Sequence, residues 1–343
     1  MDIVGALDVH RGQLTFDYID RDSGENRRGR IVPADRLGFR GWLAQFDGGR
    51  VELALEGCTG WRFIVEECQA AGVVVHLADP AEAAESRGSK GRAKTDRLDA
   101  KRLRRLLEKG EVPESWIPPT FVLEIRTKAR LYKDLIDEKK AWQQRIHATL
   151  FHQGVPKVDG KLWRKNRAQD ARDDAGLSPA GQQAIDVALR MLAMVDAELA
   201  PLRAELVAFG RRHPGPVELA KEYGIGPLLA TIVWEEMGDT RRFHASRNAV
   251  RHTGLDVSVY SSDGKRRGRP RISRQGPPML RWALYEAAVH ANKKTSPDHD
   301  TYEQLANRIG RGRARITLAR KLARRCHHRL QAIGDAAFTE TAA

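Results

Sequence analysis

The stretch DIVGALD, residues 2–8, decides how the first part of this chain folds, because a short apolar run ends there in an acid. The run VELALEG at 51–57 has the same form, with Glu56 near its end. Between them lie the alternating segment QLTFDYID at 13–20 and a short apolar segment at 30–32. Runs of this length and alternation predict four strands.

After the fourth predicted strand, the sequence changes to a helical pattern. The segment TGWRFIVEECQAAG at 59–72 has helical periodicity and ends in a glycine. The apolar run VVVHLAD at 73–79 then predicts a buried strand. Strand, helix and strand in this order are typical of an α/β sheet. A charged helix, DRLDAKRLRRLLEKG, follows near Thr95, and a first domain is therefore expected at 1–115.

The rest of the chain is predicted to be helical. Two long segments at 121–153 and 178–212 have apolar residues at heptad-like spacing, which predicts a coiled-coil hairpin or oligomerisation arm within 116–213. A C-terminal domain at 214–343 opens with a helix, a Gly-Ile-Gly-Pro turn and a second helix, and it ends in a strongly basic helix. The predicted fold class is α/β plus α.

Charge and cysteine usage limit the function classes. The 343 residues include 59 Lys and Arg against 45 Asp and Glu, a formal charge of +14 that favours a polyanionic partner such as nucleic acid. The three cysteines have no metal-ligand spacing and are interpreted as ordinary thiols of a reducing compartment. We see no leader pattern and no apolar run of membrane-spanning length, so a cytoplasmic protein without a membrane partner is expected.

Four acids are placed to hold a metal ion. Asp8 and Glu56 end predicted strands, and Asp96 and Asp99 lie three residues apart on one helix face. Converging carboxylates suit Mg²⁺, which prefers oxygen ligands and assists phosphodiester chemistry. For any one of these acids alone, a surface or helix-capping role is the favoured interpretation. Together they form the pattern of ribonuclease-H-like nucleases and transposases, with one or two Mg²⁺ ions that Mn²⁺ can replace.

A serine pair provides a second candidate site. Ser261 and Ser262 precede Asp-Gly and a run of cations, and a serine beside cations can attack a phosphodiester. Serine before Asp-Gly is also an ordinary turn residue. The Gly-Ile-Gly-Pro turn, with Gly224 and Gly226, resembles a helix-hairpin-helix that holds phosphate through backbone amides, although packing explains it equally well.

Basic residues in loops are the remaining candidates for phosphate contact, although charge runs are more often simply solvated. The candidates are Arg87, Lys90, Arg92, Lys94, Lys265, Arg266, Arg267, Arg269 and Arg271.

Taken together, these motifs resemble the DEDD transposases of insertion sequences, relatives of the Piv invertase that include the bridge-RNA-guided recombinases. The matching stretches are ALDVH, ALEGC, KTDRLDA, GIGPLLATIV, NAVRHTGL and SSDGKRRGR. The resemblance covers nearly the whole chain in the right order. It implies a RuvC-like first domain whose four acids correspond to Asp8, Glu56, Asp96 and Asp99, a coiled-coil middle and a C-terminal domain with a catalytic serine.

The resemblance places that serine on Ser262, with Ser261 as the alternative, because Val257 and Asp263 stand where the family has proline and glycine. It implies a recombinase that forms a phosphoserine intermediate on donor and target DNA. It also implies a bridge RNA and a dimer or tetramer. The alternatives are a hydrolytic RuvC-like nuclease or Holliday-junction resolvase, which needs no serine, and a basic nucleic-acid-binding protein that is not an enzyme.

Overall fold

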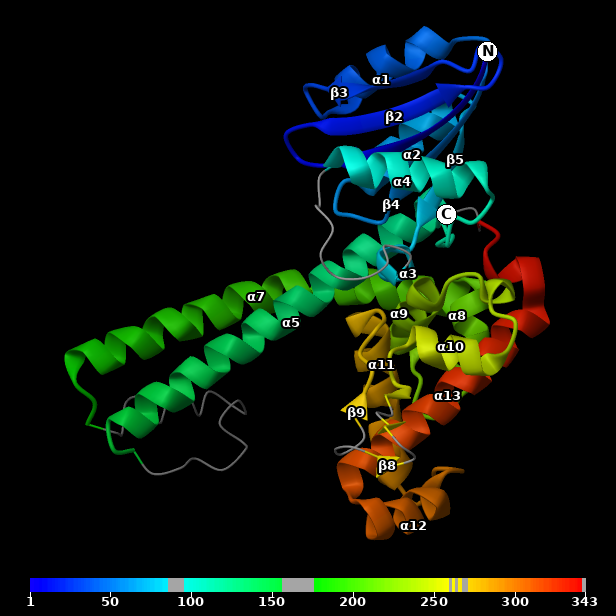
Figure 1. The fold of residues 1–343 in the computed structure, drawn as a ribbon. Coiled ribbons are helices and arrows are strands. Elements are labelled where there is room, and N and C mark those ends of the chain that lie inside the picture. Colours follow the sequence, from blue (N-terminus) through cyan, green and yellow to red (C-terminus); the bar gives the residue numbers. More distant parts are fainter. Residues whose placement is uncertain (86–95, 156–175, 259–260, 263–264, 267–270, 341–343) are drawn as a thin grey trace. The chain divides into compact units, whose positions relative to one another are not determined.

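The computed structural model describes residues 1–85, 96–155, 176–258, 261–262, 265–266 and 271–340 (Figure 1). The chain divides into two compact units, Met1–Ile117 and Pro118–Ala343. The first unit contains a five-stranded sheet with helices, and the second is mostly helical, which confirms the predicted α/β plus α class. The helical region expected at 116–213 belongs to the second unit from Pro118 onward.

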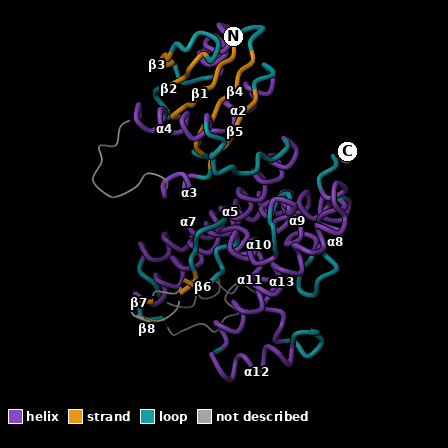
Figure 2. Tube along the Cα trace, turned by 45° about the vertical axis from the view of Figure 1, so that its right-hand side comes forward, coloured by secondary structure: helices purple, strands orange, loops and turns teal. Residues whose placement is uncertain are grey.

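The sheet of the first unit is mixed, with order β3-β2-β1-β4-β5 and β1 at its centre (Figure 2). Strand β1 pairs antiparallel with β2 and parallel with β4, and β4 pairs parallel with β5. The strands are β1 Asp2–Val9, β2 Leu14–Asp20, β3 Asn26–Ile31, β4 Arg50–Glu56 and β5 Val74–Ala78.

Alternation along β1 divides the apolar core between the two faces of the sheet. Ile3 and Leu7 point into a cluster with helices α1 (Arg36–Leu43) and α2 (Trp61–Ala70). Val4 and Ala6 point to the opposite face, because successive side chains of a strand alternate. Helices α1 and α2 therefore cover one face of the sheet.

The opposite face is covered by helix α4 (Asp96–Glu108), with the short helix α3 (Pro80–Glu85) beside it. Val4 and Ala6 of β1 pack in this second cluster. Helix α4 places Ala100, Leu103, Arg104 and Leu107 toward the sheet, the spacing of a single helix face. The charged helix predicted near Thr95 is confirmed, and it forms the third layer of the unit.

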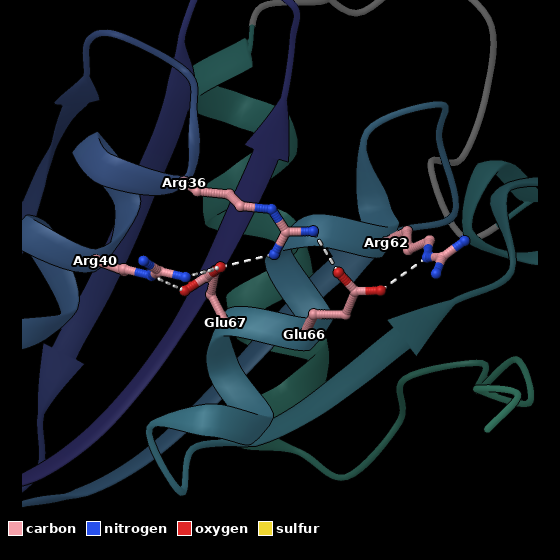
Figure 3. Close-up of polar contacts among 5 residues, drawn as sticks. All are labelled: Arg36, Arg40, Arg62, Glu66 and Glu67. Atoms are coloured by element: carbon pink, nitrogen blue, oxygen red, sulfur yellow. Dashed lines mark hydrogen bonds and ion pairs between the residues drawn. The ribbon is translucent and has the colours of Figure 1, made fainter. Parts of the chain in front are cut away.

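An ion-pair network joins α1 to α2 (Figure 3). Arg36 donates to Glu67 at 2.7 Å and also pairs with Glu66, which accepts from Arg62 at 2.7 Å. Arg40 pairs with the same Glu67, whose side chain is only 4% exposed. The hydrogen bond from Arg40 is the main cause that lowers the pKa of Glu67. The acid remains charged because two guanidinium groups compensate its burial.

A buried ion pair fixes α4 to the sheet. The Nε atom of Arg104 lies 2.5 Å from Oδ1 of Asp17 in β2, and both side chains are less than a tenth exposed. Asn26 donates to the same carboxylate oxygen at 3.1 Å, so the acid has a second polar partner. The sequence analysis did not anticipate this pair, because Arg104 is one of several cations of α4 and nothing in their spacing shows which one turns toward the sheet.

The second unit begins with an antiparallel pair of long helices, α5 (Thr120–His152) and α7 (Pro179–Arg212). The order of their contacts shows the antiparallel arrangement, with Lys128 bonded to Glu205 at 2.7 Å and Lys139 bonded to Asp196 at 2.5 Å. An apolar cluster follows toward the end of the pair: Ile146, Leu150, Leu177, Ile185, Ala188 and Leu192. The two long helices predicted here are confirmed, and they run antiparallel; their coiled-coil character stays a prediction.

A buried tryptophan of α9 (Pro227–Met237) joins the long helices to the C-terminal end of the chain. Trp234 lies within 6.1 Å, between ring centroids, of Phe121, Phe209, His213 and Phe338. Its indole nitrogen donates to the Ala337 carbonyl at 2.7 Å. The other α-helices that follow α7 are α8 Pro214–Leu219, α10 Ser246–His252, α11 Pro278–Val289, α12 His299–Ile309 and α13 Arg311–Ile333. No helix among the described ranges has the length and apolar character of a membrane span.

We predict that Arg104→Met destabilises the first unit by about 3–5 kcal/mol, because the buried Asp17 loses its compensating cation. Urea unfolding of the full chain, with hydrogen exchange of residues 2–20, measures the loss. The matched control is Arg50→Met, whose pair with Glu52 is exposed on the arginine side and is expected to contribute less than about 1 kcal/mol. Equal effects of the two substitutions would contradict this role for Arg104.

We predict that the second unit loses stability as pH falls below about 6.5, the ordinary pKa of histidine. His213 accepts a hydrogen bond from the Gly215 N–H and donates one to the Thr339 carbonyl, so only its neutral form satisfies both contacts. Burial lowers the pKa of His213. As pH falls, His213 therefore takes up a proton in the unfolded chain before it does so in the folded chain. Proton binding then favours the unfolded state, and the free energy of unfolding decreases below the unfolded pKa.

The measurement is urea unfolding at pH 7.5 and 5.5, followed by helical circular dichroism. His213→Asn keeps a hydrogen-bond acceptor for Gly215 but cannot titrate, so its stability should change less between the two pH values. An unchanged pH difference in this variant would assign the acid sensitivity to other groups.

Candidate functional site

The candidate site lies at one end of the central strands of the first unit. Leu7 in β1 is opposite Leu55 in the parallel strand β4, so Asp8 and Glu56 follow at the same level of neighbouring strands. Each acid comes two residues after an alanine, Ala6 or Ala54, that packs on the α4 face. Strand alternation therefore places both acids on that same face.

Helix α4 contributes the other two acids. Asp96 and Asp99 lie in its first turn. They precede the buried Ala100 and Leu103 by four residues each, so they extend the inward face of the helix beyond the sheet edge. Packing of α4 on β1 and β4 brings this first turn to the end where those strands finish.

A histidine that the sequence analysis did not select contacts both Asp8 and Asp96. Nε2 of His10 lies 3.1 Å from Oδ2 of Asp8 and 3.5 Å from Oδ1 of Asp96. Gln13, in the same turn, donates to Oδ2 of Asp96 at 3.2 Å. The signal that could have found His10 is its position in ALDVH, two residues after the strand acid.

One group of potential ligand atoms, from Asp8, His10 and Asp96, lies within a mutual distance of 4.8 Å in the described part of the chain. Glu56 and Asp99 are not members of that group, although both lie at the same end of the fold. The structure thus brings Asp8 and Asp96 together directly. The charge of Asp99 also acts on Asp8, and Glu56 is the last residue of the neighbouring strand β4.

The pKa of Asp8 reflects its burial and the negative charges close to it. Burial is the main cause that raises the pKa of Asp8, and the nearby charges of Asp96 and Asp99 raise it further, whereas His10 lowers it. A carboxylate that is partly desolvated and faces two like charges is stabilised by a cation. Two carboxylates and an imidazole are also ordinary donors for a divalent ion, so the residues fit a metal.

The serine pair lies in the second unit, where Ser261–Ser262 form strand β7 and Lys265–Arg266 form its partner β8. Ser262 is opposite Lys265 in this antiparallel pair. The side chains of these four residues lie outside the described part of the structure. Strands β6 (Val257–Ser258) and β9 (Arg271–Ile272) enclose the pair in sequence and are themselves antiparallel partners.

Two arginines that the sequence analysis did not single out hold the base of this serine segment. Nη1 of Arg281 in α11 donates to the Gly276 carbonyl at 2.9 Å and to the Thr253 carbonyl at 3.3 Å, one on each side of the segment. Nε of Arg320 in α13 donates to the Leu255 carbonyl at 2.8 Å. The serine segment therefore leaves the helical core from a fixed base.

Only some of the residues predicted to contact phosphate lie in the part of the chain that the structure describes. Arg87, Lys90, Arg92, Lys94, Arg267 and Arg269 lie outside the described residues. Arg271 is exposed in β9, and Lys265 and Arg266 are placed only as strand backbone.

The Gly-Ile-Gly-Pro turn lies between α8 and α9, and its two glycines differ. Gly224 has a φ of +87°, and an added Cβ would lie 2.6 Å from the Ala287 carbonyl oxygen, so packing against α11 requires glycine there. Gly226 precedes the first residue of α9, and an added Cβ would meet nothing within 4 Å among the described atoms. Only Gly226 is therefore open to an approaching ligand.

The basic C-terminal helix α13 uses several of its cations internally. Lys321 and Arg325 bond to Asp298 at 2.8 and 2.7 Å, and Arg329 bonds to Glu218 at 2.8 Å. Arg324 is exposed. Several cations of this strongly basic helix therefore stabilise the packing of α13.

Comparisons with known proteins cover both units. A sequence model of the DEDD transposases of the IS110 type matches residues 5–152, and the model "Transposase IS116/IS110/IS902 family" matches residues 218–304. The first match includes all four predicted acids, and the second includes the serine pair.

Curated relatives have similar names. "Putative transposase y4rJ" of Sinorhizobium fredii is 28% identical over 82% of this chain and 78% of its own length. "Transposase for insertion sequence element IS1111A" of Coxiella burnetii is 24% identical over 58% of this chain and 56% of its own length. "Putative transposase y4qE" of Sinorhizobium fredii is 26% identical over 57% of this chain and 48% of its own length. Because both family models match in the expected order and these relatives are named as transposases, the chain belongs to the IS110-type DEDD transposase family and is a DNA transposase.

Proposed function

We propose that the chain cuts and rejoins insertion-sequence DNA, and that its first unit is a RuvC-like catalytic domain. One observation carries the proposal: Asp8 and Glu56 end neighbouring parallel strands on the face where α4 begins with Asp96 and Asp99. Burial and the nearby charges of Asp96 and Asp99 raise the pKa of Asp8, so a bound cation would stabilise the charged form of this acid. The match of the DEDD transposase model over residues 5–152 supports the same assignment.

The metal in this proposal is Mg²⁺, as one or two ions, with Mn²⁺ as a substitute. When bound, it supplies Lewis-acid stabilisation of charge on the phosphate. Asp8 and Asp96 would hold it, because their carboxylate oxygens lie within 4.8 Å of each other. Glu56 and Asp99 would complete the site from neighbouring positions. Gln13 orients Asp96 through its hydrogen bond at 3.2 Å.

The nucleophile in this proposal is Ser262, with Ser261 as the alternative. The Oγ–P bond forms as the bond from phosphorus to a DNA 3′ oxygen breaks, and that oxygen leaves as a hydroxyl. A 3′ hydroxyl of another strand then attacks phosphorus and returns the proton to the serine. The ester conserves the bond energy, so the reaction needs no nucleotide cofactor. Fixing of the segment base by Arg281 and Arg320 supports a positioned nucleophile.

The partners in this proposal are donor and target DNA and a noncoding bridge RNA, bound by a dimer or tetramer. The formal charge of +14 supports a polyanionic partner. Bridge RNA and oligomer follow from the family resemblance of the sequence motifs. The α5–α7 helix pair is the proposed oligomerisation arm, since Leu131 and Met194 are at least half exposed along it.

We predict that Asp8→Asn and Asp96→Asn each lower strand cleavage by at least about a hundredfold, because they remove a charged ligand from the metal site. DNA binding should remain. A gel assay with labelled transposon-end DNA, Mg²⁺ and the element's RNA measures cleavage, and a filter assay measures binding. The control is Asp22→Asn, which removes an exposed acid of the same unit.

Cleavage at the wild-type rate in Asp8→Asn would exclude the carboxylate site. Loss of both cleavage and the native circular dichroism spectrum would indicate misfolding, and Asp8→Glu, which keeps the charge, would then replace it in the assay.

We predict that a covalent protein–DNA adduct forms in the wild type and is lost in Ser262→Ala, because the serine oxygen is the atom that joins phosphorus. A denaturing gel with end-labelled DNA detects the adduct. Ser261→Ala is the matched control, because it is the adjacent serine in the same strand. Cleavage without an adduct in any variant would favour the hydrolytic nuclease, and an adduct lost only in Ser261→Ala would move the nucleophile by one residue.

A further inference from the structure

His10 occupies a defined position over the pair Asp8 and Asp96. The β1–β2 turn is closed by a hydrogen bond from the His10 N–H to the Gln13 carbonyl at 3.1 Å. Gln13 in turn donates to Asp96 at 3.2 Å. Both ends of the turn are therefore attached, one to the sheet and one to the first residue of α4. This attachment holds the imidazole near the two carboxylates although its side chain is 54% exposed.

The distances at His10 are those of adjacent metal ligands. Two ligands at right angles around an ion, each about 2.1 Å from it, lie about 3 Å apart. Nε2 of His10 is 3.1 Å from Asp8 Oδ2 and 3.5 Å from Asp96 Oδ1. One nitrogen therefore lies near ligand separation from one oxygen of each acid, and ligand atoms of all three residues lie within 4.8 Å of one another.

We propose that His10 is a nitrogen ligand of the ion held by Asp8 and Asp96, and that it adds more affinity for the substitute Mn²⁺ than for Mg²⁺. The inference rests on the proposed carboxylate metal site and specifies its ligand set. Mg²⁺ is a hard ion that takes oxygen ligands and keeps its waters, whereas first-row transition ions accept imidazole nitrogen. An imidazole in the ligand set therefore adds affinity for Mn²⁺ and little for Mg²⁺.

A simple surface ion pair is the competing explanation for the contact. Exposed ion pairs contribute at most about 1 kcal/mol to stability. Such a pair between His10 and the acids would form only while no metal ion is bound. In that case His10 would leave the acids when an ion binds. Removing the imidazole would then leave Mn²⁺ affinity unchanged or raise it, which is the opposite of the effect expected from a ligand.

The test uses the full chain and Mn²⁺ alone, with no nucleic acid. Paramagnetic resonance of free Mn²⁺ gives its dissociation constant, and competition gives that of Mg²⁺. Pulsed resonance detects nitrogen coupled to bound Mn²⁺ and identifies it by ¹⁵N-histidine labelling. Two variants, His10→Ala and His10→Gln, remove the imidazole, so the test can still be made with one of them if the other misfolds. His244→Ala, which removes an exposed histidine of the other unit, is the control.

We expect histidine-nitrogen coupling in the wild type and in His244→Ala, and none in His10→Ala. The Mn²⁺ dissociation constant should rise by at least about tenfold in His10→Ala. That of Mg²⁺ should change by less than about threefold.

Absence of coupling in the wild type, or unchanged Mn²⁺ affinity in His10→Ala, would overturn the inference. The carboxylate site would survive that result if Asp8→Asn still lost the ion. Undiminished Mn²⁺ binding in Asp8→Asn would instead overturn the carboxylate site itself, and the ligand role of His10 with it.

Discussion

The parallel pairing of β1 with β4 is the constraint on which the rest of the first unit depends. Because side chains alternate along a strand, this register decides at once which residues enter the α1–α2 core and which face α4. A slip of one residue would turn Asp8 and Glu56 toward the opposite core. The apolar packing of both faces therefore also determines where the acids lie.

The position of α4 links stability to the proposed chemistry. Its apolar face packs on the sheet, and Arg104 attaches it to Asp17 through a buried ion pair. The first turn of the same helix contains Asp96 and Asp99. A buried charge pair is often neutral for stability but selective for one arrangement. Here the Arg104–Asp17 pair would keep α4 in one position on the sheet, and so would keep Asp96 and Asp99 near the strand end. The ion pair would do this although neither of its residues binds the metal.

In the second unit, charge has a structural role that composition alone does not reveal. Arg281 and Arg320 bind backbone carbonyls at the base of the serine segment, and Arg329 of α13 bonds to acids of neighbouring elements. The aromatic cluster around Trp234 joins α5, α7 and α9 within the unit. The strongly basic composition therefore includes many cations that support packing as well as those free to meet a polyanion.

The amino-acid sequence by itself determined the strand and helix order, the helical hairpin and the family. These depend on local periodicity and on motifs such as ALDVH and KTDRLDA. Only the tertiary structure decided that His10 and Gln13 contact Asp96, that Asp17 neutralises Arg104, and that Arg281 spans the base of the serine segment. Those contacts join residues far apart in the chain, and single polar residues have no periodicity from which such pairing could be predicted.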